Sequence, residues 1–356
     1  MFRAFFNFII LFAFLTSAQE KERFFYTNKT YGSESLFNPL TLMVNGGFDV
    51  TQLQLVSNRA NELQYGKMFR IVMRNLGSPL KSINDYGWNK FLRGEFLPLS
   101  FKRDEMQWIP NYQQHLIGSG MQYTMMREWY EEQSVPLAGW LSAATLMTQH
   151  ILNEMIETGV DERWSVDEVS DIYIFDLAGI LLFQSDAVNR FFANELNLSD
   201  WSLQASLTAP GWRVNAGQYF SIKWKFPFSE KYSLFYRYGM GALFGISEKM
   251  DNGDNLSYGV GFKSKHFMEV ISEVRQRTIA TSWHAGVFWD RENSLLGSFV
   301  LSGVKEYFIM ADIYPGILRI GNISPGIWTI IGRNGDVLVG LSSRWLIGFG
   351  VESQLR

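Results

Sequence analysis

Five ionisable side chains stand out in a largely apolar stretch of the chain: they are His115, His150, Glu154, Asp171 and Asp176. Imidazole and carboxylate groups together are suited to general acid–base catalysis and to the binding of a divalent metal. His150 and Glu154 are four residues apart, so they share one face of a helix. Because burying such groups is unfavourable unless they pair, we expect the five side chains to converge in one interior.

We assign these residues to roles by their chemistry. The candidate catalytic residues are His115, Glu154 and Asp171, and the candidate binding residues are His150, Asp176 and Arg127; no residue is assigned as a metal ligand. The pattern His-x-x-x-Glu is less specific than the His-Glu-x-x-His motif of zinc hydrolases. A buried network that fixes the register of the helices explains the same residues without any catalysis.

Several other chemistries are excluded or poorly supported. The 356 residues include no Cys, which excludes thiolate metal sites, a Cys nucleophile and disulfides. The net charge of −3 gives no basic signature for nucleic acid. Ser119, between Gly118 and Gly120, lies in a predicted helix, so we interpret it as a helix-packing contact rather than a nucleophile. The sequence identifies no cofactor.

The first helix that must position the site begins after Pro110 and carries His115. Gly118 and Gly120 follow on the same helix and reduce its intrinsic stability. Small residues at these positions indicate the close approach of another helix or strand.

Two further helices complete the predicted helical module. The second begins at Pro136 and ends at Gly159, a favourable residue for a helix C-terminus. The third begins near Ser165 and carries Asp171 and Asp176, which are about a turn and a half apart at α-helical pitch.

The N-terminus has the pattern of a secretory signal peptide. A short positive start that ends at Arg3 precedes an apolar run over residues 4–15, and small residues lead up to Ala18. We expect cleavage after Ala18. An exported protein without Cys fits a bacterial envelope.

The segment after the signal peptide carries few motifs. Residues 19–35 are largely polar and are expected to form a loose leader. Asn38 and Pro39 predict the start of a helix, and residues 45–47 (Asn-Gly-Gly) predict its interruption.

From Trp201 onward the hydrophobic period changes from about 3.6 to about 2 residues. Phe220, Ile222 and Trp224 alternate with polar residues, for example, and Tyr258 and Val260 alternate with Gly or Ser. Aromatic residues make up 16% of the chain, which is typical of membrane β-barrels with aromatic girdles. A soluble barrel or sandwich has the same alternation with its faces reversed.

These patterns predict an α+β protein in which an N-terminal helical module precedes an antiparallel β-barrel of about 10–12 strands. We divide the chain into a signal peptide (1–18), a leader and packing collar (19–107), a helical module with the buried polar set (108–196) and the barrel (197–356).

The helices over residues 108–183 resemble the VanZ-like superfamily. The matching residues are His115, Glu154, Asp171 and Gly179. Where that family often has Asn-x-x-Gly, this chain has Asp176-Leu177-Ala178-Gly179. The whole chain is similar to envelope proteins of unknown function that join such helices to a barrel. The resemblance implies an envelope setting and lipophilic ligands, and it supplies no reaction.

The leading hypothesis is an outer-membrane structural or binding protein of a Gram-negative envelope. Its helices would plug or cap the barrel and handle a lipid or another amphiphile. The expected partners are therefore outer-membrane lipid and an amphiphilic ligand, and nucleic acid is not expected. Two alternatives stay open: an envelope hydrolase that uses His115 and Glu154 as an acid–base or metal site, and a narrow channel. The alternative location is the periplasm.

Overall fold

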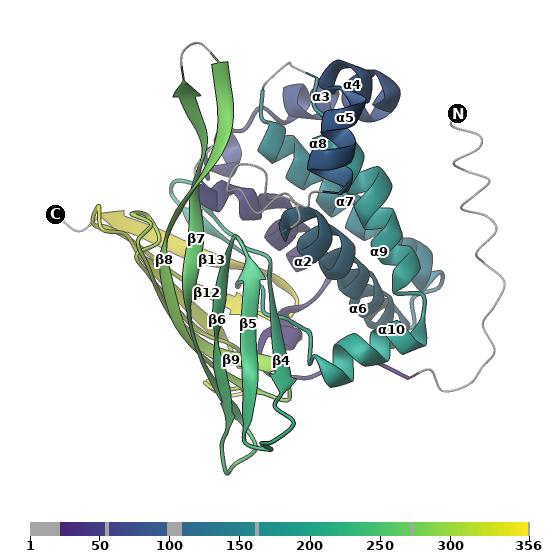
Figure 1. Ribbon diagram of the computed structural model, residues 1–356. Coiled ribbons are helices and arrows are strands. Elements are labelled where there is room, and N and C mark those ends of the chain that lie inside the picture. The colour runs from purple at the N-terminus through teal and green to yellow at the C-terminus, as the bar shows by residue number, and fades with distance from the viewer. Residues whose placement is uncertain (1–21, 54–56, 98–108, 161–163, 272–273, 355–356) are drawn as a thin grey trace.

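The computed structural model describes residues 22–53, 57–97, 109–160, 164–271 and 274–354. The predicted signal peptide lies outside these residues. The chain forms a group of helices followed by a single large sheet, so the α+β prediction is confirmed. Figure 1 shows the helices gathered on one side of the strongly curved sheet.

The helices include several of the wider π type. The α-helices are α2 (Pro39–Phe48), α3 (Tyr65–Gly77), α4 (Pro79–Tyr86), α5 (Trp88–Phe91), α6 (Ser119–Glu132), α7 (Ala138–Thr158), α8 (Asp167–Ser170), α9 (Leu177–Leu182) and α10 (Asp186–Arg190). The 3-10 helices are η1 (Ser33–Leu36), η2 (Asp49–Leu53) and η3 (Ala60–Glu62). The π-helices are η4 (Leu92–Phe96), η5 (Ile109–Gly118), η6 (Asp171–Asp176) and η7 (Phe191–Glu195). None of the helices in the described part of the chain is both long and apolar enough to cross a membrane.

The sheet has 13 strands in the order β1-β4-β5-β6-β7-β8-β9-β10-β11-β12-β13-β2-β3. The strands are β1 (Ser199–Asp200), β2 (Ser206–Ala209), β3 (Val214–Asn215), β4 (Tyr219–Lys225), β5 (Tyr232–Gly239), β6 (Gly241–Lys249), β7 (Asn255–Ile271), β8 (Val274–Arg291), β9 (Ser294–Ser302), β10 (Ile309–Ile313), β11 (Gly326–Ile331), β12 (Asp336–Ser343) and β13 (Leu346–Gln354). Neighbours are antiparallel, except that β13 and β2 are parallel.

The sheet is not closed into a barrel, so that part of the prediction was wrong. Its ends are the short strands β1 and β3, and the strand number exceeds the predicted range. The residues between β1 and β2 are not strand; they bring Trp201 into the core against Phe235 and Phe288, with ring centroids 5.8 and 5.7 Å apart. Because this segment does not pair as a strand, the continuous hydrogen bonding between strands that a closed barrel requires is interrupted.

The predicted alternation of the strands is present, and its apolar side faces outward. Directly opposed residues of antiparallel strands share a face of the sheet. One row of such residues, here called the convex row, crosses every strand from β4 to β13: Trp224, Leu234, Ile246, Tyr258, Val287, Phe299, Ala311, Thr329, Val339 and Val351. Its large apolar members are exposed. Their sequence neighbours, such as Lys223, Ser257 and Phe288, are buried on the concave side.

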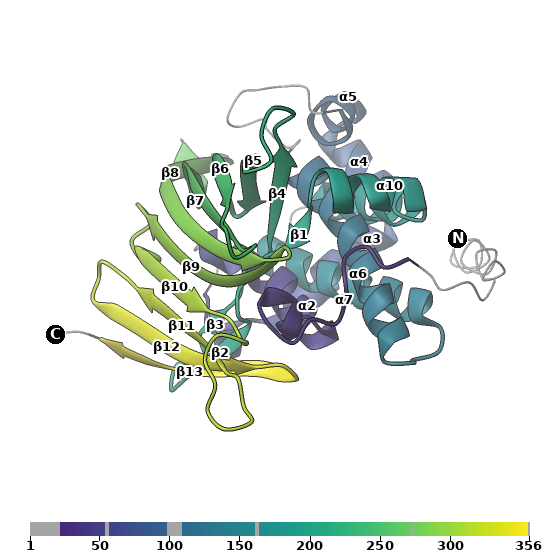
Figure 2. The same ribbon diagram turned by 90° about the horizontal axis from the view of Figure 1, so that it is seen from below.

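The helices cover the concave side of the sheet. Figure 2 shows the sheet curled around one side of the helical group, with α2, α6 and α7 in its opening. Phe220 of β4 and Tyr238 of β5 stack with ring centroids 5.2 Å apart and pack in one cluster with Met121 and Met125 of α6. This apolar interface fixes the helices relative to the sheet.

The segment before α2 is anchored, so the prediction of a loose leader was wrong for residues 22–35. Glu128 of α6 accepts hydrogen bonds from the backbone N–H groups of Phe24, Phe25 and Tyr26 at 2.7–2.9 Å. Glu34 likewise accepts from the backbone of Thr27. Glu128 is distant in the sequence and Glu34 lies within the segment itself. The polar composition of residues 19–35 reveals neither of these contacts.

Helix α2 begins as predicted but is not interrupted. Asn38 caps it, accepting from two backbone N–H groups in its first turn. The helix continues through Gly46 and Gly47, against prediction. A side chain at either position would meet Gln149 or Leu152 of α7. The two glycines therefore let α2 and α7 approach closely and do not end the helix.

Candidate functional site

The two helical segments that carry most of the site are π-helices and not regular α-helices. His115 lies in η5, and η6 begins at Asp171 and ends at Asp176. A π-helix bonds residue i to residue i+5, and such turns occur frequently at functional sites. The five-residue spacing therefore brings Asp171 and Asp176 to the same side, whereas α-helical pitch predicts that they diverge.

Glycines bring these segments into backbone contact. A Cβ at Gly118 would lie 2.7 Å from the ring of Phe220, and one at Gly120 would meet Phe183. A Cβ at Gly179 of α9 would meet the backbone oxygen of Leu116. The predicted close approach of a helix and a strand to this region is confirmed, and it holds the backbone of η5 against α9.

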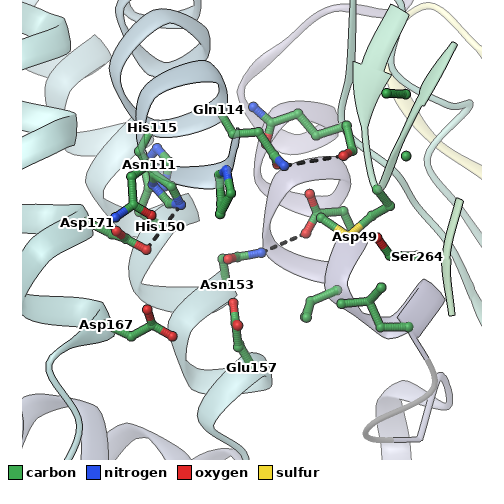
Figure 3. A pocket seen from close by; sticks show the side chains of 18 of the residues that line it. Asp49, Asn111, Gln114, His115, His150, Asn153, Glu157, Asp167, Asp171 and Ser264 are labelled. Atoms are coloured by element: carbon green, nitrogen blue, oxygen red, sulfur yellow. Dashed lines mark hydrogen bonds and ion pairs between the residues drawn. The ribbon is translucent and has the colours of Figure 1, made fainter. Parts of the chain in front are cut away.

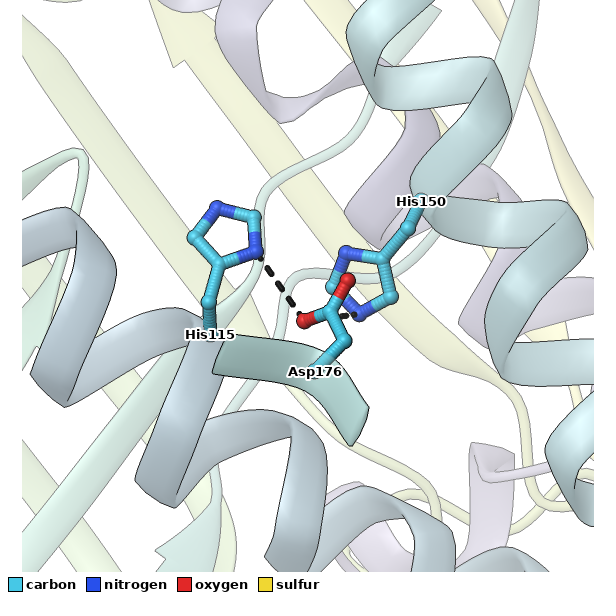
Figure 4. A group of neighbouring side chains, drawn as sticks. All are labelled: His115, His150 and Asp176. Atoms are coloured by element: carbon cyan, nitrogen blue, oxygen red, sulfur yellow. Dashed lines mark hydrogen bonds and ion pairs between the residues drawn. The ribbon is translucent and has the colours of Figure 1, made fainter. Parts of the chain in front are cut away.

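Asp176 is the centre of the buried part of the site, and it lies between two imidazole rings (Figure 4). Its Oδ1 is 3.1 Å from His115 Nδ1 and accepts a hydrogen bond from Ser119 Oγ at 2.8 Å. Ser119 Oγ is in turn 2.9 Å from His150 Nε2. Because the Ser119 hydroxyl donates to Asp176, it accepts from His150 Nε2–H. His150 Nδ1 is then a bare acceptor, and it has no hydrogen-bond partner among the described residues.

His115 faces a second carboxylate group on its other side. Its Nε2 is 3.3 Å from Asp171 Oδ2. Glu154 of α7 joins them, and the ligand atoms of the three residues all lie within 4.8 Å of one another. Glu154 is 1% exposed, and its Oε2 has no hydrogen-bond partner among the described residues. His115, His150, Glu154, Asp171 and Asp176 are called the helical cluster below.

Burial and mutual proximity shift the protonation of the helical cluster. Burial lowers the pKa of His115, but Asp171 and Asp176 more than offset it and raise that pKa to about 10. Burial lowers the pKa of His150 to about 4, so this ring is neutral at neutral pH. Burial raises the pKa of Glu154 well above its usual range, and the charge of Asp171 adds to the rise. The cluster therefore retains protons that the same groups would lose in water.

Three members of the helical cluster, His115, His150 and Asp171, line a cavity of about 120 Å³ between the helices and the sheet, which has room for several water molecules. Figure 3 shows His115, His150 and Asp171 on one wall and Asp49 and Ser264 on another. Four carboxylates line the cavity, and no Lys or Arg is among its described lining residues. Its walls comprise Asp49, Val50, Leu53, Pro110, Asn111, Gln114, His115, Gln149, His150, Asn153, Glu157, Asp167, Asp171, Gln218, Gly239, Met240, Gly241, Ala242, Phe262, Ser264 and Thr281.

Asp49 extends the acidic character of the cavity to the wall opposite the helical cluster. It accepts a hydrogen bond from Asn153 Nδ2 at 2.7 Å. Burial raises the pKa of Asp49 to about 8, and Glu157 contributes to the rise. A space lined in this way favours a cation or a neutral polar group over an anion.

The structure brings together the five residues singled out from the sequence and leaves one predicted residue apart. Arg127 does not line the cavity. It lies 3.9 Å from Glu131 and over the ring of Tyr123, on the same helix. Ser119 and Asp49 were not predicted as site residues. The glycines beside Ser119 were the one available signal, since they mark where the backbones meet; nothing in the sequence around Asp49 indicates its place.

Comparison with protein-family models gives no match to this chain, and neither the curated proteins nor the solved structures give one. The VanZ-like resemblance stays a prediction.

Proposed function

We propose that the protein is an outer-membrane binding protein of a bacterial envelope. The convex face of its sheet would contact lipid, and the helices would hold a binding site on the concave side. The observation that carries this proposal is the convex row, which crosses strands β4 to β13 and is apolar at every position except Thr329.

The exposed residues of the convex row include large aromatic side chains. Trp224 is 57% exposed and Val351, at the far end of the row, is 51% exposed. Phe244 and Val260 are opposed in a neighbouring row and are also exposed. A continuous apolar surface of this extent is unusual in water and matches the lipid-facing band of outer-membrane sheets.

The buried side of the sheet supports a binding protein rather than a channel. Trp201, Phe235 and Phe288 pack together there, and the helices cover the remaining opening. The cavity of about 120 Å³ suits the polar group of an amphiphile or a small polar solute, and not an acyl chain.

Membrane contact is tested by fractionation and by electrophoresis of heated and unheated protein. We expect the mature protein to partition with outer membranes and to migrate faster unheated. A soluble periplasmic protein that migrates identically in both states would refute the proposal.

A matched pair of variants tests the convex face itself. Val260→Arg places a charge at an exposed apolar position in the middle of β7, and Asn252→Arg places one in an exposed turn. A charge facing the bilayer midplane costs about 2–4 kcal/mol. We expect Val260→Arg to reduce membrane assembly and Asn252→Arg to leave it unchanged. If the two variants behave alike, this face is in water.

A second candidate is a hydrolase, which the pairing of Asp176 with His115 Nδ1 favours. A carboxylate on one ring nitrogen orients a histidine whose other nitrogen acts in proton transfer. His115→Ala and Glu154→Ala test this candidate against envelope lipids and esters. Variants that lose only melting temperature would exclude it.

A further inference from the structure

Three groups of the helical cluster have the separations of ligands around one metal ion. His115 Nε2 and Asp171 Oδ2 are 3.3 Å apart, which is long for a hydrogen bond between charged groups. Two ligand atoms bound at about 2.05 Å to one tetrahedral zinc ion lie about 3.3 Å apart. The ligand atom of Glu154 lies within 4.8 Å of both.

We infer that His115, Asp171 and Glu154 bind a divalent transition metal of the zinc type at the helical wall of the cavity. Imidazole nitrogen and carboxylate oxygen are both zinc ligands, and three protein ligands with one open position are the usual arrangement of a catalytic zinc site. This inference does not rest on the membrane proposal, because the three residues belong to the helices and not to the convex face.

The unpaired oxygen of Glu154 is an independent reason to expect a cation there. Glu154 is almost wholly buried, yet its Oε2 has no hydrogen-bond partner among the described residues. A buried carboxylate without a partner is destabilising unless a proton or a metal satisfies it. No Lys or Arg is among the described residues that line the adjoining cavity.

The two other ligands are each held from behind, as in known metal sites. Asp176 Oδ1 lies 3.1 Å from His115 Nδ1, which leaves Nε2 directed at Asp171. Ser170 Oγ lies 3.1 Å from Asp171 Oδ1 and 2.9 Å from the backbone oxygen of Asp167, so its single hydrogen is shared between them, while Asp171 Oδ2 faces His115 Nε2. A carboxylate behind a histidine ligand fixes its tautomer and strengthens its binding.

A second grouping, His115, His150 and Asp176, is less suited to a metal. Its ligand atoms are also within 4.8 Å of one another. The hydroxyl of Ser119, however, already bridges His150 Nε2 and Asp176 Oδ1. His150 Nδ1 is buried and has no hydrogen-bond partner among the described residues.

The test is a zinc titration of untagged, metal-free protein by calorimetry, with cobalt absorption as a second report on coordination. We expect one zinc ion per chain. Loss of a group that supports a metal ligand from behind typically weakens metal binding by roughly 10–100-fold. Glu154→Gln removes a ligand itself and should weaken zinc binding by more than this. Asp176→Asn, which changes the group behind His115, should weaken it by about 10–100-fold.

Asp312→Asn is the matched control, because Asp312 is a buried carboxylate of the sheet that does not line the cavity. It should bind zinc as the unmodified protein does. Circular dichroism of each variant separates loss of binding from loss of folding. Absence of binding by the folded unmodified protein would overturn the inference. Equal affinity of Glu154→Gln and Asp312→Asn, or a larger loss in His150→Ala than in Glu154→Gln, would overturn this ligand set.

Discussion

Two buried polar clusters of different composition lie in this molecule. The helical cluster has more carboxylates than cations and borders the cavity. The second, called the sheet cluster, comprises Arg237, Lys263, His284 and Asp312 on the concave side of the sheet. Its members have more cationic groups than carboxylates, and none of them lines the cavity.

The two clusters satisfy their charges differently. Lys263 Nζ donates to Gln52 Oε1 at 2.7 Å and lies 4.7 Å from the centre of the Tyr307 ring. The Arg237 guanidinium lies 3.7 Å from the centre of the Tyr219 ring. Aromatic faces stabilise cations but not carboxylates. The cations of the sheet cluster are therefore stabilised within the fold by an amide oxygen and by aromatic rings, although Arg237 Nε and His284 Nδ1 have no hydrogen-bond partner among the described residues. The helical cluster has an excess of carboxylates and takes protons or a cation from the cavity side.

The largest expected effect comes from a substitution that disrupts the helical cluster and leaves the sheet cluster intact. In Gly179→Ala the new methyl group would meet the backbone oxygen of Leu116, and His115 O would lie 3.1 Å from it. Because backbone atoms cannot rotate away, η5 must move off α9. We expect a loss of about 3 kcal/mol in the free energy of unfolding, measured by urea denaturation.

The control for this change is Gly66→Ala, at an exposed helical glycine that has no atoms within 4 Å of the added methyl. It should gain about 0.5–1 kcal/mol from the better helix propensity of Ala. A Gly179→Ala protein as stable as the Gly66→Ala protein would mean that the contact between η5 and α9 is loose.

The next prediction uses pH to separate the contribution of Asp49, on the wall of the cavity, from that of Lys263, in the sheet cluster. Burial lowers the pKa of Lys263 to about 7 from 10.5, and Arg237 lowers it further. Between these values the unfolded chain holds a proton that the folded chain does not, so stability rises with pH. For Asp49, burial raises the pKa from 3.8 to about 8. Between these values the folded chain holds the extra proton, so stability falls as pH rises.

Lys263→Met and Asp49→Asn isolate these two contributions. The stability of the unmodified protein relative to Lys263→Met should rise by about 1.4 kcal/mol per pH unit between about pH 8 and 9.5. Its stability relative to Asp49→Asn should fall by about the same amount per unit between about pH 5 and 7. Urea unfolding across both windows measures the slopes. A slope near zero for either group would show that this group is solvated in the folded protein.

The sequence predicted the chemistry of the helical cluster better than its geometry. The spacing of His150 and Glu154 fixed their shared helix face, and burial energetics predicted the convergence. The π-helices carry no comparable signal, so the relation of Asp171 to Asp176 was misjudged.

For the sheet, too, the sequence predicted some features and not others. The alternation predicted which residues share a face, because a strand places successive side chains on opposite sides. It could not say which face is exposed, and it gave no sign of the short strands β1 and β3 that leave the sheet open. The sheet cluster was also missed, since the positions of Arg237 and Lys263 in the alternation fit either side of the sheet.

The smallest expected effect compares one hydroxyl in each region. Ser119 Oγ bridges Asp176 and His150, whereas Ser221 Oγ on β4 is buried without a hydrogen-bond partner among the described residues. Ser119→Ala leaves two buried polar groups short of a partner and should cost about 1–2 kcal/mol. Ser221→Ala removes an unsatisfied group and should change stability by less than about 0.5 kcal/mol or increase it. Urea unfolding of both variants at neutral pH measures the difference. Equal losses of stability would mean that Ser119 contributes only packing, and that its hydrogen bonds to His150 and Asp176 add no net stability.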